Sequence, residues 1–335
     1  MRVIALDQLT EAQFEASLAA RRAFDAEVDP DLPAIPPEEW QALMTVESLN
    51  DEDQIRFGAC LDDDRMVAMA HVGMKKSPEQ RNEASCVIDG ISEAGEILLE
   101  AICNTAEQSA RTVLLAWGLL NEEEKRFWES HAMPRVYVER FSDLDVAAVD
   151  RELMRSWIAQ RHERAGDIEL VRWSGATPED WLPQMLEALD AMNDAPRDDL
   201  DIADSRSTPE KLRRQEAALD AIGEELEVLL AVDQRGRVAG LTMLGINVHR
   251  PAASWQGDTV VLSAFRNRGI GRWLKAEMWR DLREARPEVT RLRTGNAESN
   301  DAMLAINVAM GFRPAHNYGI WQGDLRDVQA TLTKK

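Results

Sequence analysis

The stretch that decides the fold reads Asp258-Thr-Val-Val-Leu-Ser-Ala-Phe-Arg-Asn-Arg-Gly-Ile-Gly-Arg272. A β-branched, apolar run at 259–265 is typical of a buried strand, and the pattern Arg266-x-x-Gly269-x-Gly271 follows it before a long amphipathic run. The first turn of a helix has backbone N–H groups without intrahelical partners, and its dipole favours negative charge. The sequence therefore predicts a strand, a glycine turn and a helix start that together bind a phosphate or pyrophosphate.

The spacing of the glycines excludes two other kinds of phosphate-binding turn. The pattern is not the Gly-x-Gly-x-x-Gly of dinucleotide-binding folds, and no acidic residue ends a strand about 20 residues further on. The Gly-Lys-Ser/Thr of a nucleotide-binding P-loop is also missing from this stretch. Close packing of a strand against a helix remains an alternative reason for the glycines.

The turn resembles the Arg/Gln-x-x-Gly-x-Gly/Ala motif of the GCN5-related N-acetyltransferases (GNAT), which holds the pyrophosphate of acetyl-coenzyme A. The downstream segment Asn300-x-x-Met303-x-x-x-Asn307-x-x-x-Gly311-Phe312 resembles the second motif of that family. The resemblance covers residues 225–321. It implies an α/β fold in which a mixed, centrally splayed β-sheet is flanked by helices.

Length and composition set the frame for this fold. With 335 residues, 44% hydrophobic and 30% charged, two soluble domains are expected. No apolar run is long enough to span a membrane, and the N-terminus turns polar too soon for a signal peptide. Cys60, Cys86 and Cys103 show neither metal-ligand spacing nor a disulfide framework. The sequence therefore predicts a cytoplasmic protein without a metal.

The net charge of −21 restricts the partners. It argues against a groove for nucleic acid, whose phosphates require basic surfaces. It fits a cationic small molecule, although a solvated acidic surface explains it equally well.

The chain also repeats itself. Arg237-Val-Ala-Gly-Leu-Thr-Met-Leu-Gly245 matches Arg65-Met-Val-Ala-Met-Ala-His-Val-Gly73 at an offset of 172 (237 minus 65). Further on the offset becomes 179 and aligns Gly90 with Gly269 (269 minus 90). One change of loop length explains the difference, so a duplication at domain scale is predicted.

The two copies differ at the glycine turn. The first half reads Val87-x-x-Gly90-x-Ser92, with Asp89 inside the turn, so a basic residue and a glycine are lost. A carboxylate there would repel a phosphate. We therefore expect a degenerate GNAT-like domain at 1–163, with a structural role, and a GNAT domain that binds acetyl-coenzyme A at 164–335.

The resemblance also implies positions for the cofactor. In the family two neighbouring parallel strands splay apart, and the pantetheine arm enters the gap like a missing strand; here the strands would be 240–248 and 259–265. Main-chain groups of Val260, Val261 and Leu262 would line the arm, and an N–H, assigned to Leu262, would polarise the thioester carbonyl. The residues assigned to the pyrophosphate are Arg266, Arg268, Gly269, Ile270, Gly271 and Arg272. Asn300 would cap the next helix and either bond the arm or act as a cap alone.

The implied reaction is direct attack of an amine on the thioester, which needs an acid for the departing thiolate and a route for the amine proton. Many family members carry a tyrosine where this chain has Asn307, which can hydrogen-bond the sulfur but cannot act as the acid. Tyr318 is a candidate acid, with strand packing or a water as the alternatives. His249 is a candidate base and Glu298 is a second one, with a solvent-facing loop residue as the alternative for each. Loop acids Asp194, Asp198 and Asp199 would bind an ammonium or serve solubility.

The sequence thus predicts an N-acetyltransferase that acts on a primary amine of a small molecule, with one competent site in the C-terminal half. The tandem layout resembles that of the mycothiol synthases, which makes a cysteinyl-type or antibiotic-type amine plausible. Two rival functions stay open: an acyl-coenzyme A-binding sensor or scaffold without turnover, and a protein-lysine acetyltransferase. Fold-level analogy alone carries the substrate class.

Overall fold

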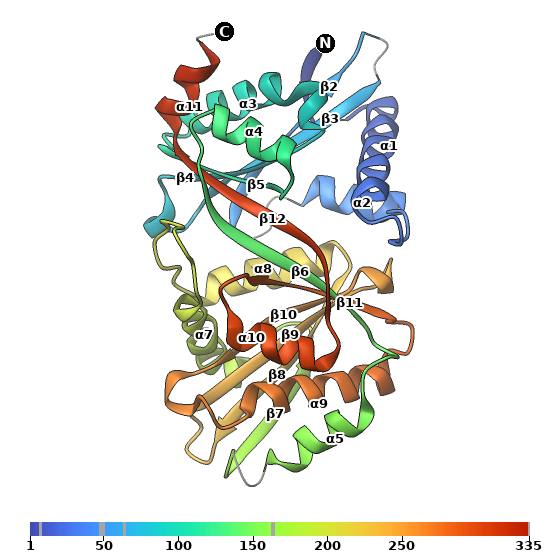
Figure 1. The fold of residues 1–335 in the computed structure, drawn as a ribbon, viewed down its shortest axis with the longest axis vertical. Coiled ribbons are helices and arrows are strands. Elements are labelled where there is room, and N and C mark those ends of the chain that lie inside the picture. Colours follow the sequence, from blue (N-terminus) through green and yellow to red (C-terminus); the bar gives the residue numbers. More distant parts are fainter. Residues whose placement is uncertain (7–8, 47–50, 63–64, 162–164, 334–335) are drawn as a thin grey trace. The chain divides into compact units, whose positions relative to one another are not determined.

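The structure is a computed structural model that describes residues 1–6, 9–46, 51–62, 65–161 and 165–333 (Figure 1). Its contacts divide the chain into two compact units. The first unit contains Met1–Glu139, Arg197–Asp204 and His316–Lys335, and the second contains Arg140–Pro196 and Ser205–Ala315. No helix among the described residues is long and apolar enough to cross a membrane.

The first unit is a sheet in the order β1-β2-β3-β4-β5-β12 with helices on both faces. Its strands pair antiparallel except for β4 and β5, which are parallel. Its elements are β1 Arg2–Ala5, α1 Glu11–Val28, α2 Pro37–Thr45, β2 Glu52–Cys60, β3 Met66–Lys75, η1 Pro78–Gln80, β4 Glu83–Asp89, α3 Ile91–Gln108, β5 Val113–Leu119, α4 Glu122–Ser130, most of β12 Arg313–Asp324, and α11 Leu325–Leu332.

The second unit is a sheet in the order β6-β11-β10-β9-β8-β7. The strands from β7 to β10 pair antiparallel, and β10 pairs parallel with β11. Its elements are the end of β6 Arg135–Asp145, α5 Arg151–Ala159, β7 Ile168–Ser174, η2 Glu179–Trp181, α7 Leu182–Asp190, η3 Ala191–Asp194, α8 Pro209–Ala221, β8 Glu224–Asp233, β9 Val238–Asn247, η4 Pro251–Ala253, β10 Trp255–Val261, η5 Ser263–Phe265, α9 Ile270–Ala285, β11 Arg291–Ala297 and α10 Asp301–Met310.

Side-chain alternation explains why each sheet has two cores. On β3, Ala70 joins the core under α3, whereas its neighbour Met69 joins the core under α1. In the second unit, Leu274 and Trp273 of α9 pack in one core, and Leu212 of α8 packs in the other. Each sheet is therefore covered on both faces, and its central strands read as nearly continuous apolar runs.

The predicted duplication is visible in the element bounds. At the offset of 172 the starts of α2, β2, β3 and β4 fall on those of α8, β8, β9 and β10. At the offset of 179 Gly90 and Gly269 both precede a helix in the left-handed conformation, with φ of 86° and 76°. The difference of 7 residues (179 minus 172) is the segment Leu262–Arg268, which separates β10 from the helix cap. In the first unit β4 reaches its cap, Gly90, directly.

The two units exchange their last strand and helix relative to the repeat. β6 begins in the first unit and ends, with α5, in the second, whereas β12 begins in the second and ends, with α11, in the first. The compact units therefore cross the expected boundary at 163/164, and the assignment of one domain to each half stays a prediction.

Two predicted elements are wrong in place. The strand expected at 259–265 is Trp255–Val261, because the chain leaves the sheet at Leu262 although Phe265 continues the apolar run as a buried residue. The apolar spacing of residues 143–160 predicts a helix over that whole stretch. The helix is only Arg151–Ala159, because β6 extends to Asp145 and the side chain of Asp150 caps the helix start.

Candidate functional site

β10 and β11 separate soon after they meet. Trp255 lies opposite Arg293, and this is the one pair in register between the two described strands. Thr294 Oγ1 still donates to the carbonyl oxygen of Gln256 at 3.1 Å, and beyond this point no ladder joins the strands. The stretch beyond Gln256 where β10 and β11 are no longer paired is called the strand gap below.

The expected splay between 240–248 and 259–265 is therefore wrong. These segments are antiparallel and stay paired, from Trp255 opposite Gly245 to Val261 opposite Gly240. The splayed strands are the parallel neighbours β10 and β11. The first unit has no such opening in its equivalent pair, since β4 and β5 stay in register from Glu83 opposite Val113 to Val87 opposite Trp117.

The N–H groups of β10 alternate in direction, and this corrects the assigned oxyanion donor. Leu262 N–H donates to the carbonyl oxygen of Ala239 at 3.1 Å, so it is already used by β9. Because neighbouring residues of a strand direct their polar groups to opposite sides, Val261 directs its groups to the strand gap. Its carbonyl oxygen accepts from Arg266 Nε at 3.1 Å, and its N–H is left facing the gap.

A β-bulge in β10 changes this alternation further along the strand. The register with β9 shifts between Gln256 and Thr259, whereas the equivalent β3–β4 ladder of the first unit has no shift. The bulge contains Asp258, a half-buried acid to which no hydrogen bond or ion pair joins another described residue. Burial raises the pKa of Asp258. Bulges often redirect a side chain beside an active site.

Sequence reasoning did not single out Asp258. The available signal was an acid beside a β-branched strand, since Asp is depleted from strand interiors. Its repeat counterpart at the offset of 172 is Cys86, a fully buried core residue.

A polar network surrounds the bulge. Gln256 Nε2 donates to Thr242 Oγ1 at 3.1 Å and to the carbonyl oxygen of Met243 at 2.7 Å, and the hydroxyls of Thr242 and Thr259 lie 2.8 Å apart. The repeat counterparts of Thr242, Gln256 and Thr259 in the first unit are Ala70, Ala84 and Val87. Only the second unit therefore has polar groups at these central positions.

The predicted helix start has the geometry of an anion site. Asn267 and Gly269 are both left-handed, with φ of 64° and 76°, and α9 begins at Ile270. Trp273 N–H bonds back to Gly269 O at 3.1 Å, which leaves the N–H groups of the three preceding helical residues without an intrahelical partner. Left-handed residues before a helix form a concave set of N–H groups that suits an anion.

Gly271 is not required by the packing around it. A Cβ built at this position would meet Ile306 and Val261 at 3.6 Å, which is ordinary contact. Its φ is helical, so no backbone strain demands glycine either. The space beside Gly271 is therefore a cradle with room for a methyl group.

Three arginines surround the glycine turn, defined here as residues 266–271 and the start of α9. Arg266 pairs with Asp194 at 2.8 Å, so this loop acid contacts the turn. Arg268 lies over the Phe265 ring at 5.3 Å and Arg272 over the Trp157 ring at 5.7 Å. Within the described ranges neither Arg268 nor Arg272 has a carboxylate partner, so both charges are available to an anion.

The second motif lies on α10, next to β11. Asn300 caps the helix as expected, because its Oδ1 accepts from Met303 N–H at 3.2 Å. Asn307 is 2% exposed, and its Nδ2 donates to Asn296 Oδ1 at 2.7 Å. Its own Oδ1 is buried without a partner among the described residues, so the structure leaves a hydrogen-bond acceptor unused there.

Of the candidates Tyr318 and His249 for proton transfer, one belongs to the first unit, and the other lies in the second unit at the far end of the β9–β10 ladder from the glycine turn. Tyr318 lies in the first unit, where it pairs with Leu119 of β5. His249 is exposed beyond the end of β9, at the end of the β9–β10 ladder where Trp255 pairs, whereas the turn follows the opposite end at Val261. Asp198 and Asp199 also belong to the first unit.

The first unit fills the place of the glycine turn with its own groups. Asp89 ends β4 and pairs with Arg21 of α1 at 3.2 Å. Burial raises the pKa of Asp89, and the charge of Arg21 acts in the opposite direction. A Cβ built on Gly118 of β5 would meet the Glu124 carboxylate at 2.5 Å. The first unit therefore differs from the second in three ways at this place: its strands stay paired, its strand reaches the helix cap directly, and a carboxylate stands at the turn.

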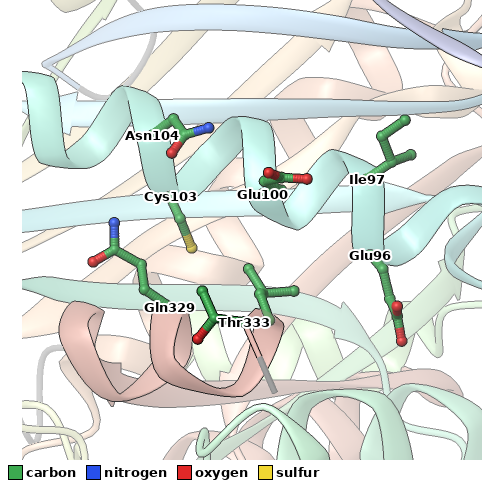
Figure 2. A pocket seen from close by; sticks show the side chains of 8 residues that line it. Glu96, Ile97, Glu100, Cys103, Asn104, Gln329 and Thr333 are labelled. Carbon is green, nitrogen blue, oxygen red and sulfur yellow. The ribbon is translucent and has the colours of Figure 1, made fainter. Parts of the chain in front are cut away.

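A groove of about 500 Å³ lies elsewhere in the first unit, between α3 and α11 (Figure 2). Glu96, Glu100 and Cys103 line it from α3, and burial raises the pKa of Cys103 to about 12. None of its lining residues belongs to the glycine turn or the strand gap. No group of metal-ligating side chains was found among the described residues.

Comparison with known proteins identifies the fold. Neither a protein-family model nor a curated protein sequence matches the chain. A tandem GNAT protein from the clavulanic acid biosynthesis pathway, solved without acetyl-coenzyme A, superposes with a TM-score of 0.75 at 18% identity over 97% of this chain and 98% of that one.

Two further structures share the arrangement. A GCN5-related N-acetyltransferase from Sphaerobacter thermophilus has a TM-score of 0.63 at 17% identity, covering 96% of each chain. The glucosamine N-acetyltransferase region of a fungal multi-domain β-N-acetylglucosaminidase has a TM-score of 0.63 at 13% identity, covering 96% of this chain and 38% of that one. The predicted tandem GNAT-like α/β fold is confirmed.

Proposed function

We propose that the protein is an acetyltransferase that takes an acetyl group from acetyl-coenzyme A and passes it to a primary amine of a small molecule, at a site in the second unit. The observation that carries the proposal is the strand gap directly before the glycine turn. Both features occur in the second unit, and both are replaced in the equivalent part of the first. The shared fold supports acyl transfer in general.

The residues around the gap suit the cofactor along its length. The N–H groups of Ile270, Gly271 and Arg272, with the Arg268 side chain, would hold the diphosphate. Arg266 would join them by exchanging Asp194 for a phosphate. Val261 N–H and the unused Oδ1 of Asn307 match an amide-rich arm, which offers both acceptors and donors.

The chain's own groups account for the acceptor side. Bound acetyl-coenzyme A supplies an activated thioester. Val261 N–H is directed into the gap, where a hydrogen bond to a carbonyl oxygen stabilises developing negative charge. Asp258 is the nearest acid on the same strand, and its raised pKa suits a group that accepts a proton from an arriving ammonium.

The departing thiol needs a proton from another source. Both tyrosines of the chain, Tyr137 and Tyr318, belong to the first unit. The second unit therefore has no phenol, and we assign this proton to solvent. The same observation favours the second candidate function, a sensor that binds acyl-coenzyme A without turnover.

The test uses paired substitutions at equivalent positions of the repeat. Gly271→Glu places a carboxylate in the cradle, and Ser92→Glu places one at the matching position of the first unit. Acetyl-coenzyme A should raise the Tm of the wild type and of Ser92→Glu but not that of Gly271→Glu. Equal stabilisation of both variants would contradict the assigned site.

A second arm separates the enzyme from the sensor. Thiol release is measured with acetyl-coenzyme A and a panel of small primary amines. The proposed enzyme releases thiol with at least one amine, and this release is lost in Gly271→Glu. Binding without thiol release against the whole panel would favour the sensor.

A further inference from the structure

A polar cluster lies on the face of the first unit's sheet that carries α1. Arg56 of β2 and His71 of β3 are cross-strand partners, and both are half-buried. Arg21 extends from α1 over the same region, since its charge and that of Arg56 both act on His71. None of these residues belongs to the site proposed for the cofactor.

Among the residues that the structure describes, Arg56 finds no counter-ion. Its Nη2 donates to Gln54 Oε1 at 2.6 Å and to the carbonyl oxygen of Val46 at 3.3 Å. Nothing else among the described residues accepts from its Nε or Nη1, and no carboxylate pairs with it. Burial lowers the pKa of Arg56. A guanidinium taken partly out of water without an anion carries an uncompensated desolvation cost.

The neighbours of Arg56 would not compete with a bound anion. Arg21 is neutralised by Asp25 and by Asp89, the latter at 3.2 Å, so neither acid is directed at Arg56. Burial, Arg56 and Arg21 together lower the pKa of His71 to about 4. His71 is therefore neutral at pH 7 and adds a ring N–H donor next to the free guanidinium edge.

The internal repeat shows what the fold itself requires here. At the offset of 172, Gln54, Arg56 and His71 correspond to Leu226, Val228 and Met243. These three residues are buried in the core of the second unit. The same strand positions therefore pack with apolar side chains, and the polar set of the first unit has a reason other than folding.

We propose that Arg56 and His71 form a binding site for a carboxylate or phosphate group in the first unit, separate from the proposed acetyl-coenzyme A site. A guanidinium and an imidazole N–H are the donors that both oxyanions accept. The degenerate half of the repeat would then bind a second, anionic ligand.

The test compares anions at constant ionic strength. The full-length protein is titrated with sodium phosphate or sodium acetate, each replacing sodium chloride, and the Tm is measured. A saturable rise with phosphate identifies a phosphate site, and a rise with acetate alone identifies a carboxylate site. The rise should persist in Arg126→Ala, which removes an exposed arginine of α4, and disappear in the double variant Arg56→Val, His71→Met.

The double variant carries the residues of the second unit, so it also tests a purely structural role. In chloride alone its Tm should equal or exceed that of the wild type. A large fall would overturn the proposal, because the cluster would then serve folding. Absence of any anion-dependent rise in the wild type would overturn it as well.

An NMR readout does not depend on the double variant folding. Bound anion offsets the charge of Arg56, so the pKa of the His71 ring should rise in phosphate or acetate. The chain has 5 histidines, and the His71→Met single variant assigns the resonance. A His71 titration that is the same in all three salts would contradict the site.

Discussion

At the scale of single residues, the proposed reaction assigns the amine proton to Asp258. It is an acid inside a central strand, held in a bulge and left without a described partner. The repeat places a cysteine at the matching position, so the fold does not need a carboxylate there. In the proposed reaction this half-buried carboxylate, whose pKa is raised by burial, accepts the proton from the amine.

Asp258→Asn keeps the shape of the side chain and removes its basicity. We expect kcat/KM for the amine to fall by about 10²–10⁴ while acetyl-coenzyme A still stabilises the protein. Because burial raises the pKa of Asp258, the wild-type rate should fall as pH drops through that raised pKa, and the variant should lack this step. Steady-state rates between pH 5 and 8 check both points. An unchanged pH profile in the variant would remove Asp258 from the reaction.

His71 gives a prediction about stability and pH. Its pKa in the folded protein is about 4, below the ordinary value of 6.5. The unfolded chain therefore binds more protons between these values, and the free energy of unfolding contributed by His71 falls as pH falls through that window. Between pH 7 and pH 5 the free energy of unfolding of the His71→Met variant should fall by about 1–2 kcal/mol less than that of the wild type. Urea unfolding at the two pH values measures this, and equal losses would show that His71 is not desolvated.

Some residues of the site were predictable from sequence and others were not. The left-handed Gly269 and the helix cap Asn300 depend on local backbone chemistry, so the sequence pattern alone predicts them. The sequence did not show that the N–H of Val261, and not that of Leu262, faces the strand gap. The direction of a strand N–H depends on its ladder partner, and the bulge in β10 shifts the register by one residue.

At the scale of elements, the seven-residue segment between β10 and α9 separates the two units most clearly. Leu262–Arg268 supplies two of the basic residues of the glycine turn and moves the helix start away from the strand. The first unit joins the equivalent strand and helix through Gly90 alone. The sequence offsets predicted an insertion of this length, but only the structure locates it at the cofactor turn.

Deleting Leu262–Arg268 should give the second unit the direct strand-to-helix connection that the first unit has. The direct strand-to-helix connection is compatible with the fold, as β4 and α3 show, so far-UV circular dichroism should be retained. Acetyl-coenzyme A should no longer raise the Tm, because Arg266, Arg268 and the left-handed Asn267 are lost and the helix start is drawn up to the strand. A cofactor-dependent rise in a folded deletion variant would show that the segment is not the binding element.

At the scale of the whole molecule, the repeat was predictable and the exchange of its ends was not. The offsets between similar segments can be read from the sequence. The unit that a strand joins depends on tertiary contacts, which the sequence does not display. Nothing in residues 135–145 or 313–324 marks the partner unit, and β6 was not predicted at all. The likeness to tandem GNAT structures shows the fold, while the activity rests on the site.

The exchange predicts how fragments behave. Residues 164–335 lack the end of β6 and α5, whose buried Met154 and Trp157 join the core of the second unit with α9. That fragment should expose apolar surface and aggregate. The full chain contains the missing segments, so it should not aggregate in this way. Gel filtration and thermal melts of the fragment and the full chain compare them. A monomeric fragment with a cooperative melt close to that of the full chain would show that the exchanged segments are dispensable.

The central claim is that the strand gap and the glycine turn of the second unit bind acetyl-coenzyme A, and a crystal structure with this cofactor tests it most directly. The account predicts density between β10 and β11, with the diphosphate against Gly271 and no matching density at Gly90. Density at Gly90, or a cofactor bound away from the glycine turn, would contradict the account.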